Sequence, residues 1–414
     1  ERAGAVHRTS GHLSQDVLDI ENKVRSNLFG WRGQFSPQLV EALLRAYAPQ
    51  DAFILDPFVG SGTVLYEAGH LGLRALGTEI NPAAGKLAQI YQLINKDRPE
   101  RKTILNNLES SLTRLAYDDL PLFTGLHGNP RGSEVEKLLV ALHRTLVDPE
   151  TRALLETLIV SLDFHAQPVS TARLASKWKD LKKLVMELPY AQNSIALKLC
   201  DARALPLENS VVDLVITSPP YINVFNYHQQ YRGSAEAMGW RALEVAKSEI
   251  GSNRKHRQNR FLTVIQYCLD IAAALRELKR VSKPAAEMIF VIGRESNVRK
   301  TAFFNGQIIE GLAIRCAGLK TVLKQERAFK NKFGAAIREE IITFGIPSGT
   351  NTASLDNPRV VARDILQEAA HRAPAESLRD LRFAIDAVDV VRPSPIFKPL
   401  SANPLLRSMA SNRE

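Results

Sequence analysis

The sequence predicts an α/β fold with a mainly parallel sheet, a terminal β-hairpin and a helical insert. Residues 51–80 read as strand, loop, helix and strand, and strand-like apolar runs resume at 195–199, 211–217 and 286–293. Two strands joined through a helix imply parallel pairing with a right-handed crossover. A length of 414 residues with 45% hydrophobic content suffices for a full core and suits two or three structural units.

The first element expected is a helix over residues 37–48, whose apolar positions recur at helical spacing behind Ser36 and Pro37. A serine N-cap followed by proline in the first turn is a typical helix start. A strand at 51–55, a glycine-rich turn, a helix at 63–72 and a strand at 75–80 follow.

Residues 98–194 contain several helix-like stretches and show no convincing strand alternation, so they are interpreted as an inserted helical subdomain and a candidate for target recognition. Its basic stretch contains Lys177, Trp178, Lys179, Lys182 and Lys183, although lysines on a helix face are usually only solvated.

Beyond the insert, a long helix is expected at about 260–281 and two hairpin strands at 319–329 and 338–346. After residue 346, proline and serine punctuation with one helix near 358–372 predicts a weakly packed extension. The expected parts are therefore 1–97 and 195–346 for the core, 98–194 for the insert and 347–414 for the C-terminal extension.

The composition favours a basic, nucleic-acid-binding or otherwise polyanion-binding protein. The net charge is +10 and the pI is about 9.5, a balance that ribosome-associated, membrane-surface and merely basic soluble proteins share. Cys200, Cys268 and Cys316 lie far apart without a CxxC pattern, so neither disulfides nor a metal site is expected. The absence of a long apolar run predicts a cytoplasmic protein without a membrane partner.

The segment Asp56-Pro57-Phe58-Val59-Gly60-Ser61-Gly62-Thr63 stands where a strand ends and a helix begins. Its glycines allow the backbone to approach a ligand closely. A P-loop would require GK[ST], and a dinucleotide fingerprint would require a glycine where Leu65 stands. Glu79 ends the next strand at the spacing of a ribose-binding acid, so a nucleoside ligand is expected.

DPFVGSGT followed by GTEINP resembles the cofactor loop and ribose-binding acid of the S-adenosylmethionine-dependent methyltransferases. The resemblance implies a Rossmann-like class I methyltransferase fold with a seven-stranded sheet and S-adenosyl-L-methionine as cofactor. It implies that the glycines approach the methionine moiety, that Glu79 holds the ribose, and that Asp201 lies at the adenine amino group. The implied cofactor-binding residues are Phe35, Ser36, Asp56, Pro57, Phe58, Gly60, Gly62, Thr63, Glu79, Ile80, Asn81, Asp201 and Ala202.

Ser218-Pro219-Pro220-Tyr221 follows the apolar run at 211–217, and ligand sites of open α/β sheets lie at the carboxyl ends of strands. The prolines stiffen this loop and remove two backbone donors, so its carbonyls remain as acceptors for an exocyclic amine, which offers donors. We expect Ser218 Oγ and the Pro219 carbonyl to accept the amine N–H groups. Tyr221 is expected to stack on a flipped base, with Phe225 and Tyr227 also available.

Within the family, a tetrapeptide that starts with serine resembles the cytosine-N4 enzymes, whereas adenine-N6 enzymes more often have Asp or Asn there. Cytosine-C5 chemistry typically uses a cysteine nucleophile after proline, and Leu199, Tyr267 and Arg315 precede the cysteines here. The resemblance, over residues 29–95 and 195–346, therefore implies a DNA methyltransferase with cytosine N4 as favoured target. The glycine loop precedes SPPY, an order found among many adenine enzymes, so adenine N6 stays open.

The stretch at 251–260 is expected to contact DNA phosphates through Arg254, Lys255, Arg257 and Arg260, unless it is simply a solvated helix start. The resemblance implies double-stranded DNA as partner, a nucleoid-associated location, and a restriction-modification system in which a cognate endonuclease is a candidate partner. Two other functions stay open: an RNA guanine-N2 methyltransferase and a non-catalytic DNA-binding subunit.

Overall fold

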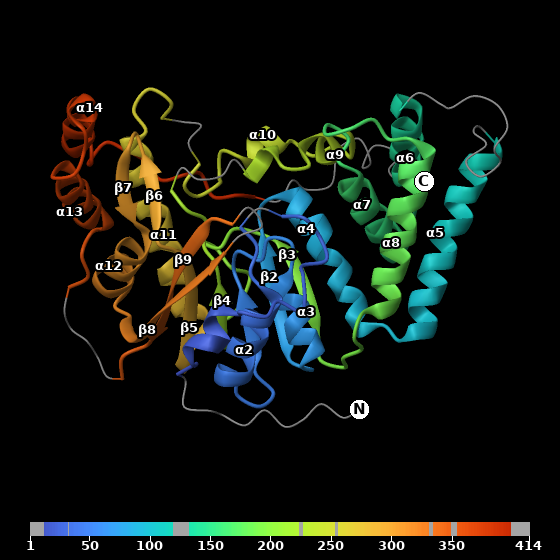
Figure 1. Ribbon diagram of the computed structural model, residues 1–414, viewed down its shortest axis with the longest axis horizontal. Coiled ribbons are helices and arrows are strands. Elements are labelled where there is room, and N and C mark those ends of the chain that lie inside the picture. The colour runs from blue at the N-terminus through green and yellow to red at the C-terminus, as the bar shows by residue number, and fades with distance from the viewer. Residues whose placement is uncertain are drawn as a thin grey trace, which may run out of the picture.

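The central feature of the computed structural model is a seven-stranded sheet in the order β3-β2-β1-β4-β5-β9-β8 (Figure 1). The structure describes residues 12–31, 33–118, 132–222, 227–252, 256–330, 334–348 and 354–398. β1 to β5 pair in parallel, and β9 runs antiparallel to both β5 and β8. The strands are β1 (Phe53–Asp56), β2 (Arg74–Glu79), β3 (Ile195–Leu199), β4 (Val212–Thr217), β5 (Ser282–Gly293), β8 (Lys320–Lys330) and β9 (Ala336–Gly345). The predicted α/β class with a terminal hairpin is confirmed.

Helices cover both faces of this sheet. Neighbouring residues of a strand point to opposite sides, so apolar side chains such as Ile54 and Leu55 have to be buried on both faces. Ile54 belongs to the core shared with α2 (Pro37–Tyr47), α3 (Thr63–His70) and the 3-10 helix η1 (Gln89–Asn95). Leu55 belongs to the core shared with α11 (Phe261–Val281) and α12 (Asn305–Ala317). α4 (Pro82–Ala88) follows β2, and Asn81 caps its first turn by accepting from the Ala83 N–H. The edge strand β8 is contacted by α1 (Gln15–Asp19), whose Asp19 accepts from the Ala328 N–H.

The chain between β2 and β3 forms a group of helices that lies to one side of the sheet, to the right in Figure 1. They are α5 (Arg98–Asp118), α6 (Gly132–Thr145), α7 (Pro149–Leu162) and α8 (Thr171–Glu187). The buried Arg101 guanidinium donates to the carbonyls of Leu93, Leu188 and Pro189, which joins the start of α5 to the end of α8. In the described part of the chain, none of the helices is both long and apolar enough to cross a membrane.

Residues 227–250, called the lid segment below, lie between β4 and α11 over the carboxyl ends of the parallel strands (Figure 1). This segment contains the short helices η2 (Tyr227–Gln229), α9 (Arg232–Ala237) and α10 (Ala242–Val245). A second small sheet, β6 (Glu295–Val298) with β7 (Thr301–Phe304), follows β5 and was not expected. Its turn residues Arg299 and Lys300 adopt positive φ without glycine, so the usual hairpin signal is missing.

Residues 354–398 of the C-terminal extension are packed onto the core, so the expectation of weak packing is wrong for this part. These residues form two helices, α13 (Pro358–Ala370) and α14 (Ala375–Asp386), of which the sequence predicted one. Val361, Leu366 and Leu381 are buried in the same core as α11 and α12. The apolar positions of α13 recur at helical spacing, and that face covers α11 and α12.

We predict that Leu366→Ala lowers the free energy of unfolding by about 2–5 kcal/mol, because the side chain is fully buried and its removal leaves a cavity. Val360→Ala on the same helix is the control, since Val360 is 40% exposed and its loss is expected to cost less than about 0.5 kcal/mol. Urea unfolding of both variants measures the difference. Equal, small losses would show that the extension does not belong to the cooperative core.

Candidate active site

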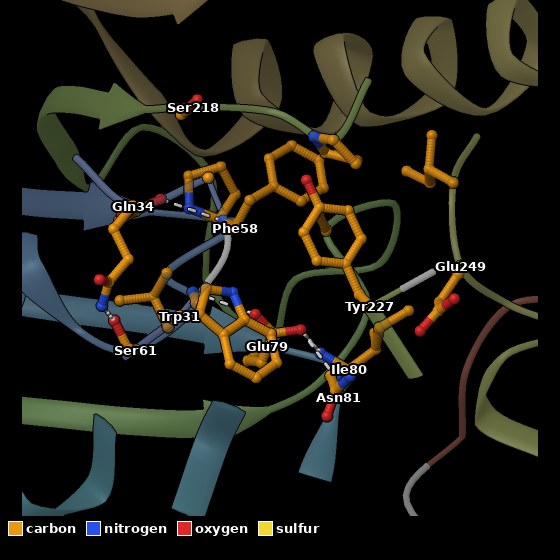
Figure 2. Close-up of a pocket in the computed structure, with 18 of the residues that line it drawn as sticks. Trp31, Gln34, Phe58, Ser61, Glu79, Ile80, Asn81, Ser218, Tyr227 and Glu249 are labelled. Atoms are coloured by element: carbon orange, nitrogen blue, oxygen red, sulfur yellow. Dashed lines mark hydrogen bonds between the residues drawn. The ribbon is translucent and has the colours of Figure 1, made fainter. Parts of the chain in front are cut away.

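A cavity opens at the carboxyl ends of β1, β2, β3 and β4, with about 880 Å³ of empty space including its opening to solvent, and Figure 2 shows 18 of the residues that line it. The loops after all four strands contribute to it because parallel strands end at the same edge of a sheet. The sequence-predicted residues that line it are Phe35, Asp56, Pro57, Phe58, Gly60, Thr63, Glu79, Ile80, Asn81, Asp201, Ala202, Ser218 and Pro220.

Other predicted site residues do not line this cavity. Ser36 is the N-cap of α2, Gly62 is the N-cap of α3, Pro219 is buried, and Tyr221 packs against the core shared with α11 and α12. Arg257 and Arg260 are exposed ahead of α11. Arg254, Lys255 and Phe225 lie outside the described residues.

The cavity also has lining residues that were not assigned to the site from the sequence. Val59, Ser61 and Cys200 are neighbours of predicted residues, and Gly33 and Gln34 directly precede the predicted Phe35 and Ser36. The sequence suggests Tyr227 only as a residue that could stack on a base. Trp31 and the lid residues carry no local motif, so no signal in the sequence identified them. The full additional set is Trp31, Gly33, Gln34, Val59, Ser61, Cys200, Tyr227, Ser248, Glu249 and Ile250.

Glu79 holds the glycine loop against the end of β2. Its Oε2 accepts from the Gly60 N–H at 3.0 Å, and its Oε1 accepts from the N–H groups of Ile80 at 2.9 Å and Asn81 at 2.8 Å. Gly62 has a φ of +94°, and a Cβ there would lie 2.6 Å from the Tyr91 ring, so the turn requires glycine. Burial raises the pKa of Glu79 to about 7 despite these hydrogen bonds.

Asp56 connects the glycine loop to the SPPY loop. Its Oδ1 accepts from Thr217 Oγ1 at 2.7 Å and from the Phe58 N–H at 3.1 Å. Thr217 ends β4 and directly precedes Ser218. Asp56 is only 2% exposed, and burial raises its pKa to about 7. The two loops are therefore fixed relative to each other by a hydrogen bond inside the sheet edge.

The Tyr221 hydroxyl is used within the SPPY loop. It lies 3.1 Å from Ser218 Oγ and accepts from the Gly293 N–H at 3.0 Å. The ring packs against Gly293, and burial raises the pKa of Tyr221 to about 12, so the phenol stays protonated. This arrangement does not support the expected stacking role of Tyr221. It orients the Ser218 hydroxyl instead, and Tyr227 is the tyrosine that faces the cavity (Figure 2).

The Asp201 carboxylate is already saturated. It accepts from Arg203 through N, Nε and Nη2 at 3.0, 2.8 and 2.6 Å, and from the Phe397 N–H at 2.8 Å. A carboxylate offers about four acceptor positions. The expected role as acceptor for an adenine amino group is therefore not supported, because protein donors occupy the positions it needs.

Arg203 lies at the centre of this buried cluster. It also donates to Asp270 at 2.7 Å and to the carbonyls of Ser394, Pro395 and Ser248. The C-terminal segment, residues 394–397, thus contacts Arg203 and Asp201 next to the cavity, and Ser248 and Asp201 line the cavity itself. One guanidinium connects the end of β3, the lid segment, α11 and the C-terminal segment.

Aromatic rings close another side of the cavity. Trp31 stacks with Tyr227 at a centroid distance of 6.3 Å and with Tyr231 at 6.2 Å. The carbonyl of Gly30 accepts from the Tyr231 hydroxyl, and the Trp31 indole lies over Gly60. The segment before α2 and the lid segment therefore enclose the glycine loop together.

The cavity is acidic. Asp56, Glu79, Asp201 and Glu249 line it, and no lysine, arginine or histidine does so among the described residues. Such a lining favours a cationic or uncharged ligand and disfavours phosphate groups. Within the described ranges, no group of histidine, cysteine and acidic side chains is arranged to hold a metal ion.

Comparison with known proteins relates the chain to DNA methylases. Residues 7–89 match the family model N6_N4_Mtase, described as DNA methylase. The type II methyltransferase M.BsoBI of Geobacillus stearothermophilus is 23% identical over 264 residues, which are 51% of this chain and 52% of that protein. The type II methyltransferase M.MjaII of Methanocaldococcus jannaschii is 36% identical over 95 residues, 22% of this chain and 18% of that protein.

The chain thus spans about half the length of M.BsoBI and a smaller part of M.MjaII. Among solved structures, a SAM-dependent methyltransferase from Methanosarcina mazei aligns with 72% of this chain and 94% of that chain, at 13% identity and a TM-score of 0.34.

We predict that Arg203→Leu lowers the free energy of unfolding by about 3–5 kcal/mol, because Asp201 and Asp270 would remain buried without a counter-ion. The control is Arg363→Leu, which removes a partly exposed pair with Asp389 and is expected to cost less than about 1 kcal/mol. Urea unfolding of each variant provides the comparison. A loss for Arg203→Leu no larger than the control's would contradict the central role of this guanidinium.

Proposed function

We propose that the protein is an S-adenosylmethionine-dependent methyltransferase that acts on the exocyclic amino group of a DNA base, with cytosine N4 as favoured target. The observation that carries this proposal is that the glycine loop with Glu79 and the SPPY residues Ser218 and Pro220 line one cavity. Group transfer requires donor and acceptor sites to share such a space. The DNA methylase match over residues 7–89 and the type II methyltransferase relatives support DNA as acceptor.

The residues present fit S-adenosylmethionine. The ligand is a nucleoside without phosphate and carries a sulfonium charge, which matches a cavity lined by Asp56, Glu79 and Glu249. Gly60 lines the cavity without a side chain, so the ligand can approach the backbone closely there. When bound, this cofactor supplies an activated methyl group.

The protein's own part in the reaction is to bind and orient the amine. Ser218 lines the cavity, and its Oγ accepts one N–H group of the amine. The carbonyl of Pro219, a residue that does not line the cavity in this structure, would accept the second N–H group once the amine is bound, so that the nitrogen is held toward the cofactor side. Tyr221 fixes the Ser218 hydroxyl, and the Asp56–Thr217 hydrogen bond fixes the loop. The rings of Trp31 and Tyr227 help to exclude water. No covalent intermediate with the protein is required.

The assignment to cytosine rests on Ser218 as the first residue of the tetrapeptide. A base in a duplex must leave the stack to reach this cavity, and Tyr227 offers it an aromatic surface. We further propose that Arg257 and Arg260, which are exposed, contact phosphates, and that the helices between β2 and β3 contribute to sequence recognition. A cognate restriction endonuclease is the proposed functional partner.

Transfer of labelled methyl groups from S-adenosylmethionine to duplex DNA, RNA and protein, followed by nucleoside analysis, tests the proposal. We expect label in DNA as N4-methylcytosine. Label as N6-methyladenine would overturn the choice of base, and label confined to RNA would overturn the choice of DNA. No transfer to any acceptor, while the cofactor binds, would favour a non-catalytic DNA-binding subunit.

We predict that Ser218→Ala abolishes most methyl transfer while cofactor affinity is retained, because in this scheme Ser218 contacts the amine of the DNA base and not the cofactor. Tyr221→Phe should lower kcat roughly five- to tenfold, since it deletes one hydrogen bond to Ser218 and keeps the ring. Kinetics and calorimetric binding measure the two effects separately. Full activity of Tyr221→Phe would restore a stacking role in place of orientation.

We predict that affinity for a sulfonium nucleoside rises about five- to tenfold from pH 6 to pH 8. Asp56 and Glu79 have pKa values of about 7, so both are largely protonated at pH 6 and ionised at pH 8. A cation binds the ionised forms better, and binding therefore strengthens as protons leave.

The test compares 5′-dimethylsulfonio-5′-deoxyadenosine with the neutral 5′-methylthioadenosine, neither of which carries an amino-acid group that titrates. The neutral thioether has the same ribose but no cation, so its affinity should depend less steeply on pH. Parallel pH profiles for the two ligands would contradict an electrostatic role of Asp56 and Glu79.

A further inference from the structure

Glu249 lies at the end of the lid segment and faces the cavity (Figure 2). Its Oε2 is 2.9 Å from Nδ1 of His228, which stands 21 residues earlier, just after the SPPY loop. Glu249 is 6% exposed and His228 is 4% exposed. This buried pair joins the two ends of the lid segment and fixes the direction of the Glu249 carboxylate.

The surroundings place Glu249 at the β2–β3 side of the cavity. The carbonyl of the preceding Ser248 accepts from Arg203, which follows β3. Glu79 ends β2, and its negative charge and that of Glu249 oppose each other, which contributes to the raised pKa of Glu79. Ser218 follows β4, across β1 from these residues, and Figure 2 shows it on the opposite side from Glu249.

Glu79 cannot satisfy a ribose diol alone. Three of its acceptor positions are taken by the N–H groups of Gly60, Ile80 and Asn81, which leaves about one of four. A ribose carries two neighbouring hydroxyl donors, and a buried hydroxyl without an acceptor is costly. Asp201 is saturated as well. A second carboxylate acceptor at this end of the cavity would satisfy the other hydroxyl.

We infer that Glu249, oriented by His228, is this second acceptor and binds one hydroxyl of the cofactor's ribose while Glu79 binds the other. The inference rests on the proposed function, because it requires a ribonucleoside in the cavity. Glu249 is a ligand-binding residue in this scheme, and His228 is a positioning residue that acts through it.

The experiment is a thermodynamic cycle in which the Glu249 side chain and a ribose hydroxyl of the ligand are removed singly and together. Calorimetry measures the affinities of 5′-methylthioadenosine and of its 2′-deoxy and 3′-deoxy counterparts for the wild-type protein and for Glu249→Ala. These ligands are neutral, so loss of the Glu249 charge does not obscure the comparison. For wild type, removal of the hydroxyl that Glu249 binds should weaken affinity at least about tenfold. For Glu249→Ala, removal of that same hydroxyl should weaken it no more than about twofold.

Glu244→Gln is the matched control, since Glu244 lies in α10 of the same lid segment and forms an exposed pair with Arg241. It should keep the wild-type response to both deoxy ligands. In His228→Leu, removal of the hydroxyl that Glu249 binds should no longer weaken affinity. In His228→Gln, which retains an N–H donor, most of that loss of affinity should remain. A purely structural role of His228 would change all affinities without changing the ratio between ligands.

Equal losses in wild type and Glu249→Ala would overturn the inference. So would a wild-type protein that binds both deoxy ligands as tightly as the parent nucleoside, a result that needs no variant to fold. If the wild-type protein binds neither S-adenosylmethionine nor 5′-methylthioadenosine, the proposed function itself fails and this inference fails with it. The two failures are therefore distinguishable.

Discussion

The hydrogen bond from Thr217 to the buried Asp56 carboxylate sets the relation between the two loops on which the site depends. β1 and β4 are neighbours in the sheet, so the residues at their carboxyl ends meet without a long connection, although 161 positions separate them in the chain. Because the carboxylate is removed from water, it requires such donors, and Thr217 and the Phe58 N–H supply them. The glycine loop and the SPPY loop consequently face one cavity, and a shift of either strand would separate their lining residues.

The parts of the site that the sequence predicted are those in which local order and chemistry coincide. Gly60 and Ser218 follow short apolar strands and Glu79 ends one, and the carboxyl edge of a parallel sheet brings such residues together whatever lies between them. Trp31 and Glu249 have no comparable signature, since they reach the cavity only through the path of the segments that close over it. The β6–β7 hairpin escaped prediction for a similar reason: Arg299 and Lys300 adopt left-handed backbone without glycine, and Arg299 is held there by Gln258 and Asp380.

Asp201 illustrates why a correct position need not give a correct role. It follows β3 and lines the cavity as expected, but its acceptors are occupied by Arg203 and by the backbone of Phe397, 196 residues further along the chain. Proline and serine punctuation in the tail indicated little regular structure, which is true of 391–398, but irregular backbone can still supply buried donors and acceptors. The Ser394 and Pro395 carbonyls do so for Arg203. The described part of the extension therefore supports the cavity-lining residue Asp201 from behind and is not an appendage.

The distribution of charge adds a further constraint. The chain as a whole carries a net charge of +10, yet the lining of the cavity is acidic among its described residues. Under the proposed function, these opposite signs act on different parts of the same substrate complex. A basic exterior attracts the phosphates of DNA, whereas carboxylates inside the cavity repel phosphate and attract a sulfonium. An uncharged base can enter while the backbone that carries it stays outside, so the cavity would exclude the polyanion without excluding the atom to be methylated.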